Sequence, residues 1–417
     1  MNLKVWTKEL IAQGVRIPSP FMVDIGEEVR PNRISTKGVV LHPGTRIYGE
    51  KTVIAPNVKL SEEGPVIIVN CRLGSGVELK GGYFRESTFL ENVSVGSGAQ
   101  IREACLLEEQ VTVGHTVGLK QTILFPFVTL GSMINFCDCL MAGGTCRKNH
   151  SEVGSSYIHF NFTPQQDKAT PSLIGDVPRG VMLRNSPIFL GGQGGMIGPA
   201  RIGFGTVTTA GTVLRRDCPE GGKIISEATQ NYKRDFVTGC YGDVARRVHN
   251  NIIYIANILA LREWYRHVRR LFFTTQPTDI DLWSGVMDAI NSAVDERISR
   301  LQGLSKKMED SIRLLVGHKH QKKSLLIRRQ VQFITQWPEI ETALAGGAEK
   351  SFGTRQRDRF LKDLEKNVGE FCTSAYIPAI QGLKEEACTM GTSWLNEIVT
   401  GITNLAMERI PLCNVGP

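Results

Sequence analysis

Apolar side chains recur at every sixth position in the first half of the chain. Between residues 89 and 123 they are, in order, Phe89, Val95, Ile101, Leu107, Val113 and Leu119. A second series of small or β-branched residues follows each of these by four positions: Val93, Ala99, Cys105, Val111, Val117 and Ile123. An α-helix would give a period near 3.6 and a plain strand a period of two. A period of six is typical of a parallel β-helix, in which three short strands make one triangular coil.

The same repeat reappears on both sides of this stretch. Earlier copies begin at Ile25, Leu41, Ile54 and Leu73, and later copies begin at Leu130, Val153 and Ile202. The pattern breaks at 60–72, 141–152 and 160–196. We expect loops to leave the coil at these breaks, and functional groups often lie on loops that a rigid scaffold holds. The sequence therefore predicts a β-solenoid over residues 25–220.

From about residue 242 the composition and the hydrophobic periodicity of the sequence change. Glycine becomes scarce, and apolar residues take helical spacing from Val244 to Val268 and again after Pro277. Further helical segments are expected over about 321–345 and 355–409. The predicted organisation is an N-terminal cap over 1–24, the β-helix over 25–220, a linker over 221–241 and an α-helical domain over 242–417.

Composition and charge indicate the cellular compartment of the protein and the kinds of ligand that it could bind. Ten cysteines lie far apart, unlike those of a secreted disulfide scaffold, and the N-terminus lacks the pattern of a signal peptide. The longest apolar stretch, 252–261, is too short to span a bilayer. We therefore expect a cytoplasmic protein with no membrane partner. The net charge of +8 suits anionic ligands, whereas the basic runs at 262–270 and 318–329 favour solvated helix faces over nucleic acid binding.

Residues 157–176 abandon the six-residue pattern and carry most of the candidate chemistry. His159 offers a titratable base, Asn161 an amide and Lys168 a cation within ten residues. In a strand, His159 and Asn161 point to the same side, which is either a cleft or the interior of the coil. A capped loop with a hydrogen-bonded histidine is the alternative interpretation.

The coil, the Asn161-Phe162 pair, Lys168 and the closing segment 202–217 resemble a known domain. They are similar to the left-handed β-helix of bacterial bifunctional N-acetylglucosamine-1-phosphate uridyltransferase/glucosamine-1-phosphate acetyltransferase, a likeness that covers about 25–220. The resemblance implies a homotrimer in which acetyl-CoA and an amino sugar phosphate meet between neighbouring subunits.

The resemblance also implies roles for single residues. It assigns His159 as the base that deprotonates the amine, and Asn161 and Lys168 as ligand-binding residues. It places Phe162, Ala210 and Gly211 along acetyl-CoA.

The expected reaction is the transfer of an acetyl group from the thioester to the amine of the sugar. A histidine of ordinary pKa suits the role of general base at neutral pH. Asn161 or a backbone amide within 191–195 could stabilise the oxyanion. Candidates for phosphate contact are Arg147, Lys148, Lys168 and Arg184.

Departures from the family favour a competing hypothesis. Phe162 stands where the family has tyrosine, and His159 lies two residues before Asn161, where the family places its histidine about one coil earlier. A non-catalytic protein that binds a nucleotide sugar such as UDP-N-acetylglucosamine, or that serves assembly, is therefore the alternative to the acyltransferase. UDP-N-acetylglucosamine pyrophosphorylase activity is not expected, because 24 residues before the coil cannot hold a nucleotide-binding domain.

Metal binding is a weaker alternative. Cys137, Cys139, Cys146 and His150 could form a zinc site, but their spacing fits no standard finger. A γ-carbonic-anhydrase-like site would need three gathered histidines, and the histidines of the coil are too scattered. We expect acetyl-CoA as co-substrate and no metal.

Overall fold

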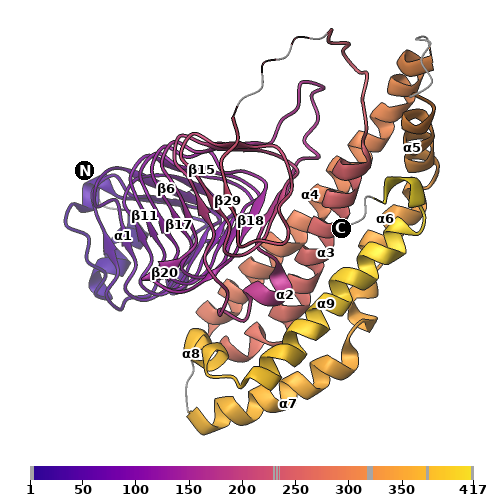
Figure 1. Cartoon of the computed structure of the whole chain (residues 1–417). Helices are drawn as coiled ribbons and strands as arrows, with labels where there is room; N and C mark the ends of the chain where they lie inside the picture. Colours follow the sequence, from indigo (N-terminus) through magenta and orange to yellow (C-terminus); the bar gives the residue numbers. More distant parts are fainter. Residues whose placement is uncertain are drawn as a thin grey trace.

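The computed structural model of the chain describes residues 4–228, 231, 233, 235–316, 323–371 and 375–414. Residues 24–225 form a parallel β-helix, and an α-helical half follows. In Figure 1 the coil stacks from indigo to magenta, and the helices stand along one of its sides. The fold class predicted from the repeats is therefore confirmed.

Sheet A is the longest of the three sheets that make up the coil. Its strands, in hydrogen-bonded order, are β2 (Val40–Leu41), β5 (Lys59–Leu60), β8 (Glu78–Leu79), β11 (Ser94–Val95), β14 (Thr112–Val113), β17 (Thr129–Leu130), β21 (Glu152–Val153), β24 (Phe189–Leu190), β27 (Val207–Thr208) and β29 (Ile224–Ile225). In most of its strands the second residue points into the coil and the first lies at the surface. The pairing of β29 with β27 carries the coil a few residues past 220.

Sheet B comes in two parts. The first part holds β1 (Asp24–Ile25), β3 (Arg46–Tyr48), β6 (Val66–Val69), β9 (Gly82–Arg85), β12 (Ala99–Ile101) and β15 (Gly118–Leu119). The second part holds β22 (Ile158–Phe160), β25 (Gly195–Ile197) and β28 (Val213–Leu214). Asn135 joins the two parts, because it bridges to Gly118 on one side and to Ile158 on the other.

Sheet C differs from the others because both of its faces are buried. Its strands are β4 (Val53–Ile54), β7 (Arg72–Leu73), β10 (Thr88–Phe89), β13 (Leu106–Leu107), β16 (Ile123–Leu124), β18 (Cys139–Met141), β23 (Ser172–Ile174) and β26 (Arg201–Ile202). The register aligns one outward-facing row: Val53, Arg72, Thr88, Leu106, Ile123, Leu140, Leu173 and Arg201. All of this row except Arg201 is buried. Two-sided burial requires a second layer over the sheet.

The helical half provides that layer. Helix α4 (Pro277–Val316) packs along β4, β7, β10 and β13, and α3 (Ala245–His267) packs on β23 (Figure 1). The remaining helices are α5 (Lys323–Thr335), α6 (Trp337–Ala345), α7 (Thr354–Phe371), α8 (Tyr376–Gln381) and α9 (Glu385–Met407). Helix α9 packs on α3, α6 and α7. Among the described helices, none combines the length and the apolar character needed to cross a bilayer.

Ion pairs fasten the helices to the coil. Arg72 of β7 donates to Asp288 of α4 at 2.8 Å. Arg297 of α4 donates to Asp138 of the coil at 2.8 Å, and both side chains are almost fully buried. Because a buried charge is costly unless it is paired, these contacts fix where α4 lies on sheet C.

Smaller elements complete the coil. Helix α1 (Val5–Ala12) packs against β1, with Leu10 fully buried. The hairpin of β19 (Gly144–Cys146) and β20 (Asn149–His150) leaves the coil after β18. The short helix α2 (Val177–Gly180) packs against α3 and α9.

We expect Leu106→Asp to unfold the protein far more readily than Thr112→Asp. Leu106 lies under α4, so an aspartate there would be buried without a partner and would cost at least about 3 kcal/mol. Thr112 is the equivalent outward residue of sheet A in the same coil and is only half-buried, so its change should cost about 1 kcal/mol or less. Urea unfolding followed by circular dichroism measures the free energy of unfolding of both variants. Equal losses in the two would contradict the packing of α4 on sheet C.

Candidate functional site

His159 lies inside the coil. It is the inward residue of β22, in register with Met196 of β25, and only 1% of its surface is exposed. Its Nδ1 lies 2.7 Å from the carbonyl oxygen of Cys137, and its Nε2 lies 2.8 Å from Oγ of Ser172. A carbonyl can only accept, so Nδ1 carries the hydrogen and Nε2 accepts from the Ser172 hydroxyl. Ser172 Oγ in turn accepts from the amide of Ala200 at 3.0 Å.

Burial controls the charge of this histidine. Removal from water lowers the pKa of His159 to about 4, although the nearby carboxylate of Asp138 and the Cys137 carbonyl oppose the shift. The ring is therefore neutral at neutral pH, with both nitrogens engaged. This is the buried, hydrogen-bonded arrangement that the sequence left open, and it disfavours a general base at His159. The catalytic role stays a prediction.

Asn161 is held by a buried ion pair. Its Nδ2 donates to Oδ2 of Asp138 at 2.6 Å, while Arg297 of α4 donates to Oδ1 of the same carboxylate. Asn161 is therefore tied to the contact between the coil and α4. One of its two Nδ2 hydrogens is taken by Asp138, so an oxyanion could use only the other.

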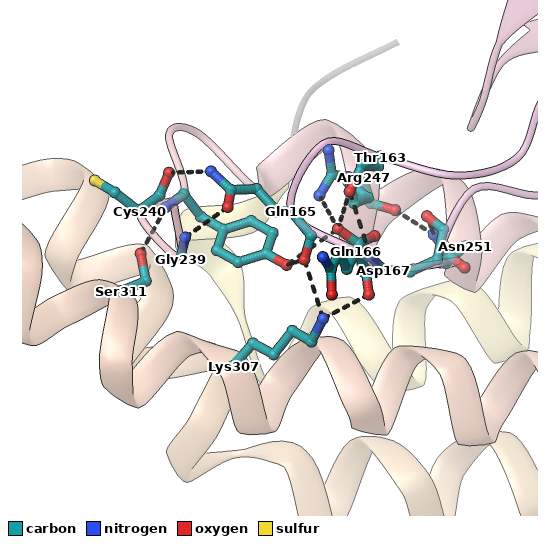
Figure 2. A network of polar contacts seen from close by, with 12 residues as sticks. Thr163, Gln165, Gln166, Asp167, Gly239, Cys240, Arg247, Asn251, Lys307 and Ser311 are labelled. Carbon is teal, nitrogen blue, oxygen red and sulfur yellow. Dashed lines mark hydrogen bonds and ion pairs between the residues drawn. The ribbon is translucent and has the colours of Figure 1, made fainter. Parts of the chain in front are cut away.

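The loop after Asn161 is fastened by a polar network to the helical half (Figure 2). Asp167 accepts from Thr163 at 2.5 Å, from the Tyr241 hydroxyl at 3.0 Å and from Arg247 of α3 at 3.4 Å. Lys307 of α4 donates to the carbonyls of Gln165 and Gln166 at 3.1 and 2.6 Å.

The other side of the same loop is held by the segment that precedes α3. The Gln165 side chain bonds to the backbone of Gly239 and Cys240 (Figure 2). Contacts from two helices and this segment therefore set the shape of the loop.

Four of the residues to which the resemblance assigns a ligand lie at the surface. Phe162 is 56% exposed, and Lys168 is exposed with no hydrogen bond or ion pair among the described residues. Ala210 and Gly211 are exposed at a turn of the coil, where Gly211 has φ +76° and open space around it. Its amide donates to the Gly192 carbonyl at 2.9 Å. These four positions are free to meet a ligand.

The arginine candidates for phosphate contact are already engaged. Arg147 donates to the carbonyls of Gln110 and Phe127 and to the Thr129 hydroxyl. Burial lowers the pKa of its guanidinium.

The second arginine, Arg184, turns away from the coil. It donates to the carbonyls of Gln381 and Leu383 and pairs with Glu385, so it fastens the coil to α8 and α9. Lys148 is exposed on the hairpin. The structure therefore does not gather the cations around His159 and Asn161.

Three of the five backbone amides in the glycine-rich segment 191–195 are also occupied. The amides of Gly191, Gln193 and Gly195 donate to Thr208 Oγ1, the Ser155 carbonyl and the Thr212 carbonyl, respectively. These bonds belong to the stacking of the coil. An oxyanion could not use these amides without breaking the coil.

The zinc alternative is not supported by the geometry. The thiol of Cys137 donates to Asn135 Oδ1, and the thiol of Cys139 donates to the Cys137 carbonyl. Cys146 is exposed on the hairpin. His150 bonds to the Arg147 carbonyl. Across the part of the chain that the structure describes, no three His, Cys, Asp or Glu side chains are arranged to hold a metal ion.

Residues that shape this region escaped the sequence analysis. They are Asp138, Asp167, Tyr241, Arg247 and Arg297. Two of them carried a signal, because Asp138 interrupts a buried run and Arg297 stands on the apolar side of a helix between Val294 and Ile298. A charge among apolar residues indicates a buried partner.

Comparisons with known proteins agree with the resemblance of the coil. No protein-family model matches the chain. The bifunctional protein GlmU of Thermotoga petrophila is 26% identical over 237 residues, which cover 55% of this chain and 46% of that protein. GlmU of Synechococcus elongatus is 25% identical over 225 residues, covering 54% and 44%. The chain thus matches less than half the length of these curated relatives, and the similarity supports a β-helix domain of the acetyltransferase type.

A solved structure was also compared with the chain. LpxA from Acinetobacter baumannii is 14% identical and covers 66% of this chain and 96% of that one. Its TM-score is 0.17, which is too low to support an argument.

We expect His159 to make the folded protein less stable in acid. Between about pH 6.5 and about pH 4 the unfolded chain binds a proton at His159 that the folded chain does not, so the free energy of unfolding falls as pH falls. The loss between pH 7 and pH 5 should be about 2 kcal/mol. Urea unfolding at both values should show a smaller loss in His159→Met, whereas Met196→Leu in the same column should keep the full loss.

Loss of the Arg297 guanidinium should leave the Asp138 carboxylate buried with only Asn161 as partner. We expect Arg297→Met to lower the free energy of unfolding by about 3 to 5 kcal/mol. Asp138→Asn in the same chain should restore most of that loss, because the remaining groups are neutral. Urea unfolding of the unchanged protein, the two single variants and the double variant gives the coupling energy between Arg297 and Asp138. If the losses of the two single variants simply add in the double variant, the two residues do not act as a pair.

Proposed function

We propose that this chain is a sugar acyltransferase-like protein that transfers an acetyl group from acetyl-CoA to the amine of an amino sugar phosphate. The observation that carries the proposal is the free, exposed state of Phe162, Lys168, Ala210 and Gly211. These are the positions that the resemblance assigns to acetyl-CoA and the sugar. The sequence similarity to GlmU, which covers 55% of this chain, supports a coil of the acetyltransferase type.

Copies of the coil would complete the site as a homotrimer. Sheet C is covered by helices, so sheets A and B remain for contact with another copy. Apolar side chains project outward from sheet B near the candidate loop: Ile158, Phe160 and Ile197 are 44%, 43% and 39% exposed. Burial of such a strip between copies would remove it from water.

The reaction requires one proton transfer. The amine nitrogen attacks the thioester carbon, a C–N bond forms, the C–S bond breaks, and the amine proton passes to a base as the thiolate of CoA leaves. Lys168 would pair with the phosphate of the sugar. For His159 to take the proton, the Ser172 hydroxyl must first release Nε2.

A second candidate function is a non-catalytic protein that binds a nucleotide sugar or serves assembly. The buried state of His159, with both ring nitrogens bonded, favours it.

The decisive assay mixes the protein with acetyl-CoA and glucosamine 1-phosphate and follows the release of free thiol. We expect Lys168→Met to raise KM for the sugar phosphate about tenfold or more, since a charge-assisted contact is lost. Lys223→Met, an exposed lysine elsewhere on the coil, should leave KM unchanged.

His159→Gln separates the two candidates. It should abolish turnover in a protein that still folds, as circular dichroism would show, if His159 is the base. Thermal stabilisation by UDP-N-acetylglucosamine without thiol release would support the binding protein. No thiol release and no stabilisation by either ligand would reject both the transferase and the nucleotide-sugar-binding protein.

A further inference from the structure

Two arginines occupy equivalent positions near opposite ends of the outward row of sheet C. Arg72 and Arg201 both project from this sheet toward the helical half. Arg72 is neutralised by Asp288 of α4 at 2.8 Å. The guanidinium of Arg201 has no hydrogen bond or ion pair among the described residues, although the group is partly buried. One end of the row therefore carries an unpaired positive charge.

The carboxylate nearest to Arg201 is already saturated. Asp217 accepts from the backbone amide of Arg201 at 2.9 Å, from the Arg246 guanidinium at 2.9 and 3.1 Å, and from Asn250 at 3.0 and 3.1 Å. Asp217 thus pairs with the guanidinium of Arg246 and bonds only to the backbone of Arg201, so two guanidinium charges stand against one carboxylate beside the cavity. Burial lowers the pKa of Arg201, the Asp217 carboxylate opposes this shift, and the charge of Arg246 adds to it.

Arg201 lines a cavity of about 340 Å³ between the end of sheet C, α2, α3 and α9. Its apolar wall comes from residues such as Leu173, Ile202 and Val399. A small-molecule site of this kind is mostly apolar and carries a few polar groups that fix the orientation of the ligand. The volume lies at the lower end of the range for such sites.

The polar side chains that α9 contributes to the cavity carry both donors and acceptors. Thr403 Oγ1 is buried without a hydrogen-bond partner. The side chains of Asn396 and Asn404 also line the cavity and make no hydrogen bond among the described residues. The remaining charged pair of the wall, Arg179 with Asp176, is internally neutral at 2.5 Å.

We propose that this cavity binds a small organic phosphate, with Arg201 contacting the phosphoryl oxygens and Thr403, Asn396 and Asn404 bonding to hydroxyl groups of the attached carbon skeleton. A planar guanidinium presents two parallel donors that match the phosphate geometry. A hydroxyl-bearing skeleton can pair with both the donors and the acceptors of carboxamides.

The site goes beyond the proposed acetyl transfer. Its wall contains none of the residues assigned to acetyl-CoA or to the amino sugar. It joins the coil, through β23 and β26, to α3 and α9 of the helical half. A ligand here would therefore stabilise the docking of the two halves, because it binds only where both walls are present.

Calorimetric titration of the full chain with inorganic phosphate, glycerol 3-phosphate, glycerol and succinate tests the proposal. Glycerol 3-phosphate should bind, raise the melting temperature and bind more tightly than inorganic phosphate. Glycerol should not bind. Succinate binding as tightly as glycerol 3-phosphate would overturn the assignment to phosphate, and no binding of either phosphate would overturn the site.

Variants locate the binding in the cavity. Arg201→Gln should weaken glycerol 3-phosphate at least about tenfold, since a charge-assisted contact is lost. Arg215→Gln, an exposed arginine on the same coil that bonds only to the Val213 carbonyl, should not. Thr403→Val keeps the shape of α9 and removes the unpaired hydroxyl, so it tests the cavity even if Arg201→Gln fails to fold. Undiminished binding in Thr403→Val and in any folded Arg201→Gln would overturn the proposal. Acetyl transfer is assayed separately, so failure of either proposal leaves the other standing.

Discussion

The two-sided burial of sheet C is the constraint on which the rest of the structure depends. A coil with period six buries one residue of each strand in its interior and leaves the neighbouring residue outside. On sheet C the outside residues Leu106, Ile123 and Leu140 are apolar and in register, so they require a second layer. Helix α4 supplies it, and the pairs Arg72 with Asp288 and Arg297 with Asp138 set its position.

This covering layer also determines the state of the candidate site. Because α4 lies on sheet C, Arg297 and Lys307 reach the coil where the chain leaves its regular pattern. Asp138 then takes Asn161 as a second partner, and Asp167 draws in Arg247 of α3. The helical half is therefore part of the architecture of the loop, and the site cannot be treated as belonging to the coil alone.

The sequence predicted local periodicity well and long-range pairing poorly. Stacked side chains repeat along the chain, so the coil and its interior columns can be derived from spacing. The six-residue repeat could also have predicted that His159 points into the coil, because it lies six residues after the inward Val153. The partners of Asp138 and Arg184 were not, since they come from residues about 160 and 200 positions away. Nothing in local pattern encodes such contacts.

The register of β22 places the histidine inside the coil and two apolar side chains outside it. Side chains alternate along a strand, so His159 can point inward only if Ile158 and Phe160 point outward. Hydrophobicity alone would choose the reverse, and a slip of one residue would achieve it. The bonds of His159 to Cys137 and Ser172 oppose that slip, and a surface that covers Ile158 and Phe160 would oppose it further. An inward polar residue between two outward apolar ones thus favours an interface on this side of sheet B.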